Sequence, residues 1–122
     1  MNPRITAAGF IAVVLMQFPT PSLCHTTISG TTPGDGAVLE KSPPVIEIRF
    51  EHAARLTSVV LQQEGQDERS LEFKPQTSAT VFEFPDPELG EGNNVIKWKA
   101  LSGDGHVIDG TLSYTIRPAV TE

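Results

Sequence analysis

Short segments in which apolar and polar residues alternate are the feature that most limits how this chain can fold. Residues 45–52 show the pattern best, because Ile46, Ile48 and Phe50 share one parity while charged side chains occupy most of the other. Successive side chains of a β-strand point to opposite faces, so a period of two is typical of a strand with one buried face. Seven such segments are predicted, with turn residues between them: 26–31, 45–52, 56–63, 71–74, 80–84, 95–101 and 110–116.

Seven short strands without a helical period, an internal repeat or a linker predict a single all-β domain. The expected architecture is a β-sandwich or a small Greek-key barrel, immunoglobulin-like or cupredoxin-like, with no significant helix. Trp98 lies on the inward parity of segment 95–101, so we expect it in the core, where its indole N–H would need a hydrogen-bond partner.

The first 24 residues are typical of a signal peptide rather than of the folded domain. Residues 7–18 form an apolar run that is too short to anchor the chain across a bilayer. Small residues precede the end of this leader, so we expect cleavage after Cys24 and export of a domain, residues 25–122, that begins at His25. Two alternatives stay open: an uncleaved leader as a membrane tether, and a lipoprotein cut before Cys24, which bulky Leu23 disfavours.

Cleavage after Cys24 would remove the one cysteine and both methionines of the chain. The remaining 98 residues carry eight basic and 15 acidic side chains, a formal charge of −7. A metal site in this domain would therefore use nitrogen and oxygen donors, which argues against Cu(I) and for Cu(II) or Zn(II). The acidic balance argues against nucleic acid as a partner and suits cations, although most of these carboxylates need only face solvent.

The stretch Ser102-Gly103-Asp104-Gly105-His106 lies between two predicted strands and is expected to form the tip of a β-hairpin. Residues two apart in extended backbone point to the same side, so Asp104 and His106 could offer an oxygen and a nitrogen to one metal ion. An N-terminal His25 would add a chelate from its α-amine and Nδ1, and three nitrogens with a weak axial or outer oxygen suit Cu(II). Taken singly, these residues have ordinary alternatives: an Asp-Gly turn, a solvated loop histidine and a frayed terminus.

The mature sequence resembles the CopC family of periplasmic copper-resistance and copper-binding proteins. The matching pieces are the His25 start, the TPGDG turn at 32–36, the Pro-Pro-x-Ile-x-Ile-x-Phe strand at 43–50, and the run NVIKWKALSGDGH at 94–106, followed by Gly110. The last piece is the most specific, and together they cover essentially all of the mature chain.

The resemblance implies a seven-stranded Greek-key β-barrel that binds one Cu(II) ion per chain at one end. By the same resemblance, the ligands are His25 (α-amine and Nδ1), Asp104 and His106. The chain departs from the family pattern at Val107, where a proline is usual, and at His52, where some members carry a glutamate near the copper. His52 lies on the apolar parity of its segment; it could bind the metal as a fourth nitrogen, hydrogen-bond Asp104 or a water, or do neither.

The expected function is therefore that of a binding protein and not of an enzyme. It would sequester Cu(II) in the periplasm for copper resistance, or deliver the ion to an inner-membrane copper transporter of the CopD type. The protein is expected to be a monomer. The alternatives are a copper-dependent oxygenase that uses the same N-terminal histidine chelate, and a metal-free immunoglobulin-like structural module. Ser102 and Ser113 are expected to be surface hydroxyls, because no spacing supports a hydrolytic triad.

Overall fold

The computed structural model describes residues 28–120, and these residues form seven β-strands and no helix. The strands are β1 (Ile28–Thr32), β2 (Val38–Leu39), β3 (Val45–Gln63), β4 (Arg69–Ser70), β5 (Ala79–Pro85), β6 (Gly92–Ser102) and β7 (Val107–Ile116). The all-β prediction is confirmed. A search of the same residues for a helix of membrane-spanning length and hydropathy finds none.

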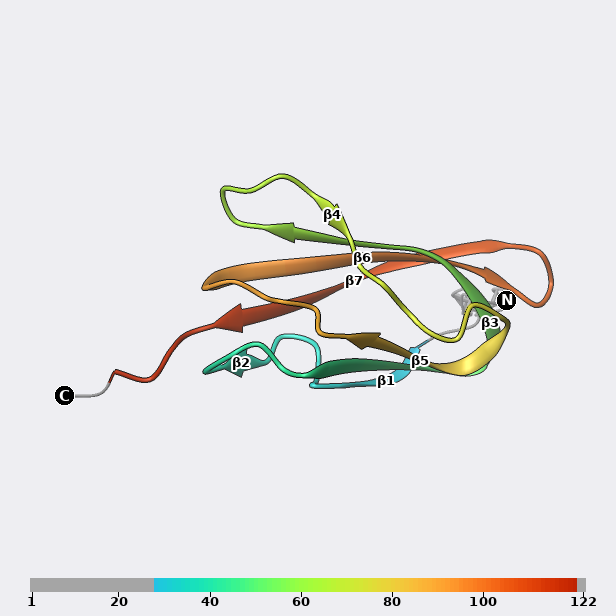
Figure 1. Ribbon diagram of the computed structural model, residues 1–122. Coiled ribbons are helices and arrows are strands. Elements are labelled where there is room, and N and C mark those ends of the chain that lie inside the picture. The colour runs from blue at the N-terminus through green and yellow to red at the C-terminus, as the bar shows by residue number, and fades with distance from the viewer. Residues whose placement is uncertain (1–27, 121–122) are drawn as a thin grey trace, which may run out of the picture.

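The strands belong to one sheet that curls into two layers (Figure 1). The order is β1-β3-β6-β7-β2, and β4 and β5 also pair with β3. The pairing of β2 with β7 is parallel, and the other strand pairs are antiparallel. In Figure 1, β6, β7 and the second half of β3 lie in one layer, and β1, β2, β5 and the first half of β3 lie in the other.

The long strand β3 joins the two layers. The sequence pattern predicts two strands here, 45–52 and 56–63, and this prediction is wrong, because the backbone stays extended through the segment between them. The pairing with β5 shifts register between Arg49 and Ala54, and residues 51–53 are all exposed. Additional residues on one strand bend it and increase its twist. The strand therefore leaves one layer after Phe50 and enters the other at Ala54, where it begins to pair with β6.

Two shorter elements also differ from the sequence prediction. Residues 71–74 do not form a strand: Leu71 is buried, and Lys74 makes an isolated bridge to Glu83. The paired residues precede them in β4, and β2 consists of only two residues that the alternation pattern does not reveal. A segment of two residues is too short to show a period of two.

The core lies between the two layers and contains the inward-facing aliphatic and aromatic side chains of β3, β5, β6 and β7. Trp98 is 4% exposed, which confirms its predicted place in the core. The rings of Phe50 and Trp98 meet edge to face, with their centroids 5.3 Å apart. The Trp98 Nε1 has no hydrogen-bond partner among residues 28–120, so the expected partner is not found there.

One end of this fold brings three segments together. Ile28 at the start of β1 pairs with Phe50, Ala54 after the bend of β3 pairs with Ser102, and the loop after Ser102 leads into β7. Figure 1 shows the bend of β3 and the β6–β7 loop at the same end of the molecule. The topology therefore places the sequence around His52 beside the loop that contains Asp104 and His106.

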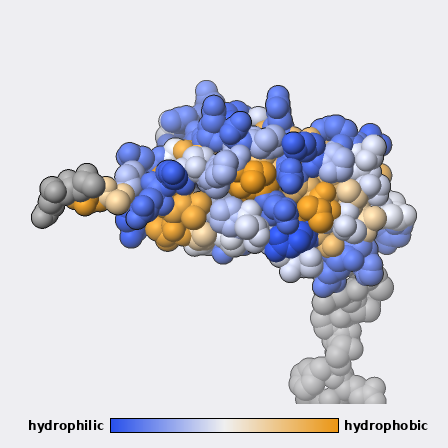
Figure 2. Space-filling model, turned by 60° about the horizontal axis from the view of Figure 1, so that its bottom comes forward, coloured by the Kyte–Doolittle hydropathy of each residue, from blue (hydrophilic) through white to orange (hydrophobic). Residues whose placement is uncertain are grey.

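The surface of residues 28–120 gives no comparable indication of a binding face. The face shown in Figure 2 is mostly hydrophilic, and its hydrophobic patches are small and separate. The large apolar side chains that are exposed are spread over several elements: Val38, Val45, Val81, Leu101, Val107 and Val120. Scattered apolar residues of this kind are normal on a protein surface.

Candidate metal centre

The loop between β6 and β7 is a tight hairpin connection, as the sequence predicts. The backbone N–H of Ser102 donates to the carbonyl of His106 at 2.8 Å, and the N–H of Gly105 donates to the carbonyl of Ser102 at 3.0 Å. Gly105 has a φ of 90°, in the left-handed region that a glycine adopts without steric cost. These contacts fix the loop backbone and set the separation of Asp104 and His106.

Asp104 and His106 contact each other directly within this loop. The Nδ1 of His106 lies 2.9 Å from Oδ2 of Asp104, and the backbone N–H of His106 donates to Oδ1 of Asp104 at 3.2 Å. The side chains of both residues are exposed. The structure thus brings the two loop residues together, and places the imidazole and the carboxylate as a hydrogen-bonded pair.

Ser102, the last residue of β6, contacts the Asp104 side chain of this pair. Its Oγ donates to Oδ1 of Asp104 and also lies 3.1 Å from the carbonyl oxygen of His106. The Ser102 hydroxyl, followed by the side chain and the backbone N–H of His106, holds the pKa of the Asp104 carboxyl well below its usual value. Asp104 is therefore a carboxylate at neutral pH.

The prediction that Ser102 is a surface hydroxyl is wrong, whereas Ser113 is exposed as expected. Ser102 is the last residue of β6 and lies on the inward parity of Trp98 and Ala100, so it is only 6% exposed. The signal was present in the sequence, since the alternation that predicts a buried Trp98 extends to residue 102. A buried hydroxyl at a strand end needs a partner, and Asp104 provides one.

His52 lies at the same end of the fold, on the bend of β3. The alternation pattern predicts that it shares the inward face of Phe50, and this prediction is wrong: His52 is exposed together with both of its neighbours. The reason is the register shift of β3, which interrupts the inward–outward order after Phe50. The backbone here adjoins the hairpin loop, because a Cβ on Gly103 would lie 3.9 Å from the carbonyl oxygen of Ala53.

His25 lies outside the residues that the structure describes. Within residues 28–120 no three His, Cys, Asp or Glu side chains gather closely enough to hold a metal ion. The described part of the predicted site consists of Asp104 and His106, which are in contact, and of His52, which lies at the same end of the fold.

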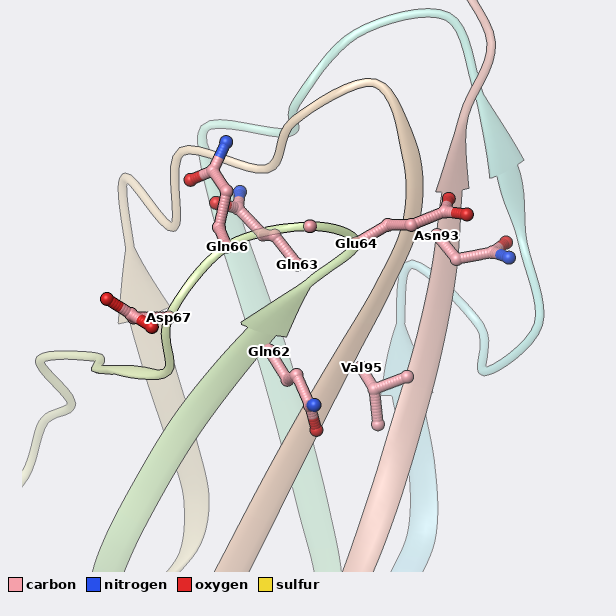
Figure 3. A pocket seen from close by; sticks show the side chains of 8 residues that line it. Gln62, Gln63, Glu64, Gln66, Asp67, Asn93 and Val95 are labelled. Atoms are coloured by element: carbon pink, nitrogen blue, oxygen red, sulfur yellow. The ribbon is translucent and has the colours of Figure 1, made fainter.

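A hollow of about 550 Å³ lies at the opposite end of β6 (Figure 3). The turn after β3 and the first residues of β6 line it: Gln62, Gln63, Glu64, Gly65, Gln66, Asp67, Asn93 and Val95. Its polar side chains are carboxamides and two carboxylates, and it lies a whole strand length away from His106. The hollow therefore differs in place and in donor chemistry from the predicted site.

Comparison with known proteins agrees with this architecture. The family model of the CopC domain matches residues 28–117. Among solved structures, CopC from Methylosinus trichosporium OB3b is 22% identical with a TM-score of 0.66, over 80% of this chain and 99% of that one. The selenomethionine structure of the copper resistance protein PcoC from Escherichia coli is 19% identical with a TM-score of 0.57, over 75% of this chain and 99% of that one. At these identities the structures support the fold, and a search of curated proteins finds no match.

The match of the family model covers β1 to β7, including the Ser102–His106 loop and the bend of β3. It confirms the resemblance predicted from the sequence motifs. The structure contributes the arrangement of the loop, and the comparison contributes the family. The chain belongs to the CopC family, whose members are periplasmic copper-binding resistance proteins and not enzymes.

Proposed function

We propose that this protein binds one Cu(II) ion in the periplasm, and either sequesters it for copper resistance or delivers it to an inner-membrane transporter of the CopD type. The proposal includes removal of a signal peptide after Cys24, which makes His25 the first residue. The observation that carries it is the contact of Asp104 with His106 in an exposed hairpin loop, at the end of the fold where β1 begins.

The donor set suits Cu(II). The α-amine and Nδ1 of His25 would form a chelate, His106 would add a third nitrogen, and Asp104 would supply an axial or outer oxygen. His25 precedes Ile28 by three residues, and three residues of extended chain reach at most about 11 Å. Ile28 pairs with Phe50, two residues before His52, so β1 starts at the correct end of the fold for this arrangement.

His52 is the other imidazole at this end, and we include it as a fourth nitrogen donor. Its exposure on the bend of β3 leaves the ring accessible to an ion. The variant His52→Ala should then lose one nitrogen from the electron paramagnetic resonance spectrum of the Cu(II) complex. An unchanged spectrum would remove His52 from the ligand set and leave the other three residues in place.

The experiment that tests the site compares three proteins: one that starts at His25, one with a glycine added ahead of His25, and a control with a glycine added after Glu122. The first and third should bind one Cu(II) with a nitrogen-rich tetragonal spectrum. The second should bind far more weakly, because the added residue separates the α-amine from the imidazole. Equal affinity of all three proteins would contradict the proposed chelate.

The place of cleavage is tested separately, by the intact mass of the protein exported from its host. The proposal expects the mass of residues 25–122. A mature N-terminus at any other residue would refute the chelate, whatever metal the protein then holds.

A further inference from the structure

Strand β7 has one edge that is only partly covered. On one side β7 pairs with β6 along its whole length, but on the other side it pairs with β2 only at Thr115 and Ile116. The segment before β2 covers the preceding residue, since the N–H of Gly36 donates to the carbonyl of Ser113 at 2.7 Å. No strand among residues 28–120 pairs with this side of residues 107–111, which we call the free edge of β7.

Alternate residues of β7 direct their backbone groups to this side. The N–H of Ser113 donates to Oδ1 of Asp35 at 2.7 Å, and the N–H of Thr115 donates to the carbonyl of Ala37 at 3.0 Å, both away from β6. The pairing of β7 with β6 has no register shift, so the odd-numbered residues of the free edge have the same orientation. Three N–H and three C=O groups therefore point outward in a row, from Val107, Asp109 and Thr111, and such a row is a template for an added strand.

The side chain of Asp109 selects the kind of strand that can add. It is exposed, and it lies opposite Lys99 of β6. A second copy of this chain would use all three outward residues only if Val107 faced Thr111, and Asp109 would then face Asp109. Like charges directly opposite each other destabilise a strand pair, whereas opposite charges stabilise it. Charge complementarity therefore favours a different chain, with a lysine or arginine opposite Asp109.

We propose that the free edge of β7 is the docking site for the protein that receives the copper ion, and that this acceptor adds an extended segment with a basic residue opposite Asp109. Main-chain hydrogen bonds provide affinity in this mode of recognition, and side chains provide specificity. Because Val107 directly follows the β6–β7 loop, the added segment would lie beside the candidate metal centre. The inference rests on the proposed function for the role of the partner, and goes beyond it by naming the interface and its chemistry.

The first test titrates the metal-free protein that starts at His25 with a synthetic peptide, Thr-Val-Thr-Lys-Thr-Val-Thr, and follows the backbone amides by NMR. We expect binding in the millimolar range. The amide signals of Val107, Asp109 and Thr111 should shift, and those of Ser113 and Thr115 should not, because their N–H groups already have acceptors. The absence of shifts at millimolar peptide, or shifts centred on another strand, would overturn the inference.

Backbone methylation of the peptide tests whether it binds as a strand. A methyl group on the nitrogen of the central lysine removes a donor that faces β7, and binding should be lost. The same methyl group on the preceding threonine points away from β7 and should leave binding within about twofold. On the protein side, Thr111→Pro removes an outward donor that β6 does not use, so it should fold and bind the peptide more weakly. Should this variant not fold, the two methylated peptides still decide the question.

A charge reversal tests the role of Asp109. The lysine peptide should bind the wild-type protein about three- to tenfold more tightly than the same peptide with a central glutamate. Asp109→Lys should reverse this preference. The control Asp67→Lys makes the same change in net charge at an exposed position in the turn after β3, and should keep the wild-type preference. An unchanged preference in Asp109→Lys would refute the proposed complementarity.

These experiments separate the inference from the proposed function, because none of them contains copper. If the protein binds no Cu(II), the proposed function fails, and the titrations still decide whether the free edge accepts a basic strand. If the protein binds Cu(II) and no peptide, the inference alone fails. Shifts of the Val107, Asp109 and Thr111 amides that grow with protein concentration in the absence of peptide would identify a second copy as the occupant, and would also overturn it.

Discussion

Gly110 is the position where the packing of this fold is most easily tested. It lies opposite Trp98 in the β6–β7 pairing, and a Cβ at this position would lie 2.6 Å from Cζ2, 2.8 Å from Cε2 and 2.9 Å from Nε1 of the indole. Real Cβ contacts are essentially never that close, so the substitution Gly110→Ala must move the ring. Phe50 packs against this ring at 5.3 Å and restricts where it can go.

The expected change in the free energy of unfolding follows from two opposing effects. Overpacking a well-filled core costs about 1–3 kcal/mol. Replacing glycine by alanine also restricts the unfolded chain, which stabilises the protein by about 0.4–1 kcal/mol where the native φ is compatible. The φ of Gly110 is not in the positive region, so this compensation applies. We expect a net destabilisation of about 1–2 kcal/mol, or about 4–16 °C in Tm for a domain of this size.

The assay is urea unfolding followed by the fluorescence of Trp98, the only tryptophan in the chain. The matched control is Gly34→Ala, because a Cβ on Gly34 would meet nothing within 4 Å and its φ is also outside the positive region. The control should be as stable as the wild-type protein or slightly more stable. If Gly110→Ala were as stable as Gly34→Ala, the close packing of the indole on β7 would be refuted.

Three further outcomes are expected. Asn94→Ala should destabilise the domain by about 2–4 kcal/mol in urea unfolding. The buried Asn94 amide accepts a hydrogen bond from the Gly90 N–H at 3.0 Å and donates to the carbonyls of Gly90 and Gly92 at 2.8 and 3.1 Å. The substitution would leave these three backbone groups without the Asn94 side chain as a partner. Asp104→Asn should destabilise the protein near pH 7, and by progressively less as the pH falls below 3.8: a carboxyl whose pKa is lowered on folding stabilises the folded state above its unfolded value of 3.8, and that contribution is lost step by step between this value and the lower folded value. Solvent screening keeps this effect small, and a difference that grows on acidification would contradict it. Cu(II) at a hundred times its Kd should raise the free energy of unfolding by about 2.7 kcal/mol in the protein that starts at His25, and by less in the form with an added glycine.

The alternation of apolar residues predicts the strands well where one face of a strand stays buried throughout. Segments 80–84, 95–101 and 110–116 lie within β5, β6 and β7 as expected. The pattern fails at residues 51–53, where the strand crosses from one layer to the other and all three side chains are exposed. Local sequence shows that the alternation stops there, but continuation of the strand depends on its partners β5 and β6, which lie far away in the sequence.

The candidate site was likewise predictable only in part. The spacing of Asp104 and His106 predicts that both side chains lie on one side of a hairpin tip, and the structure brings them into contact. The direct contact between the two side chains was not predictable, because it depends on Ser102. The Ser102 hydroxyl fixes one oxygen of the Asp104 carboxylate and thereby directs the other oxygen at the imidazole. The orientation of His52 could also not be predicted from the sequence, since it follows from a register shift between strands that lie far apart in the chain.

The exposure of the loop bears on how copper would leave it. The side chains of His106 and Asp104 are 68% and 48% exposed, so ligands of an acceptor could approach the ion while His106 still holds it. Transfer should therefore be associative, and its rate should rise in proportion to the concentration of a competing chelator. Stopped-flow absorbance of the Cu(II) complex mixed with increasing chelator measures this dependence. A rate that stays constant at all chelator concentrations would mean that the ion dissociates before capture, and that the exposed loop serves storage rather than direct delivery.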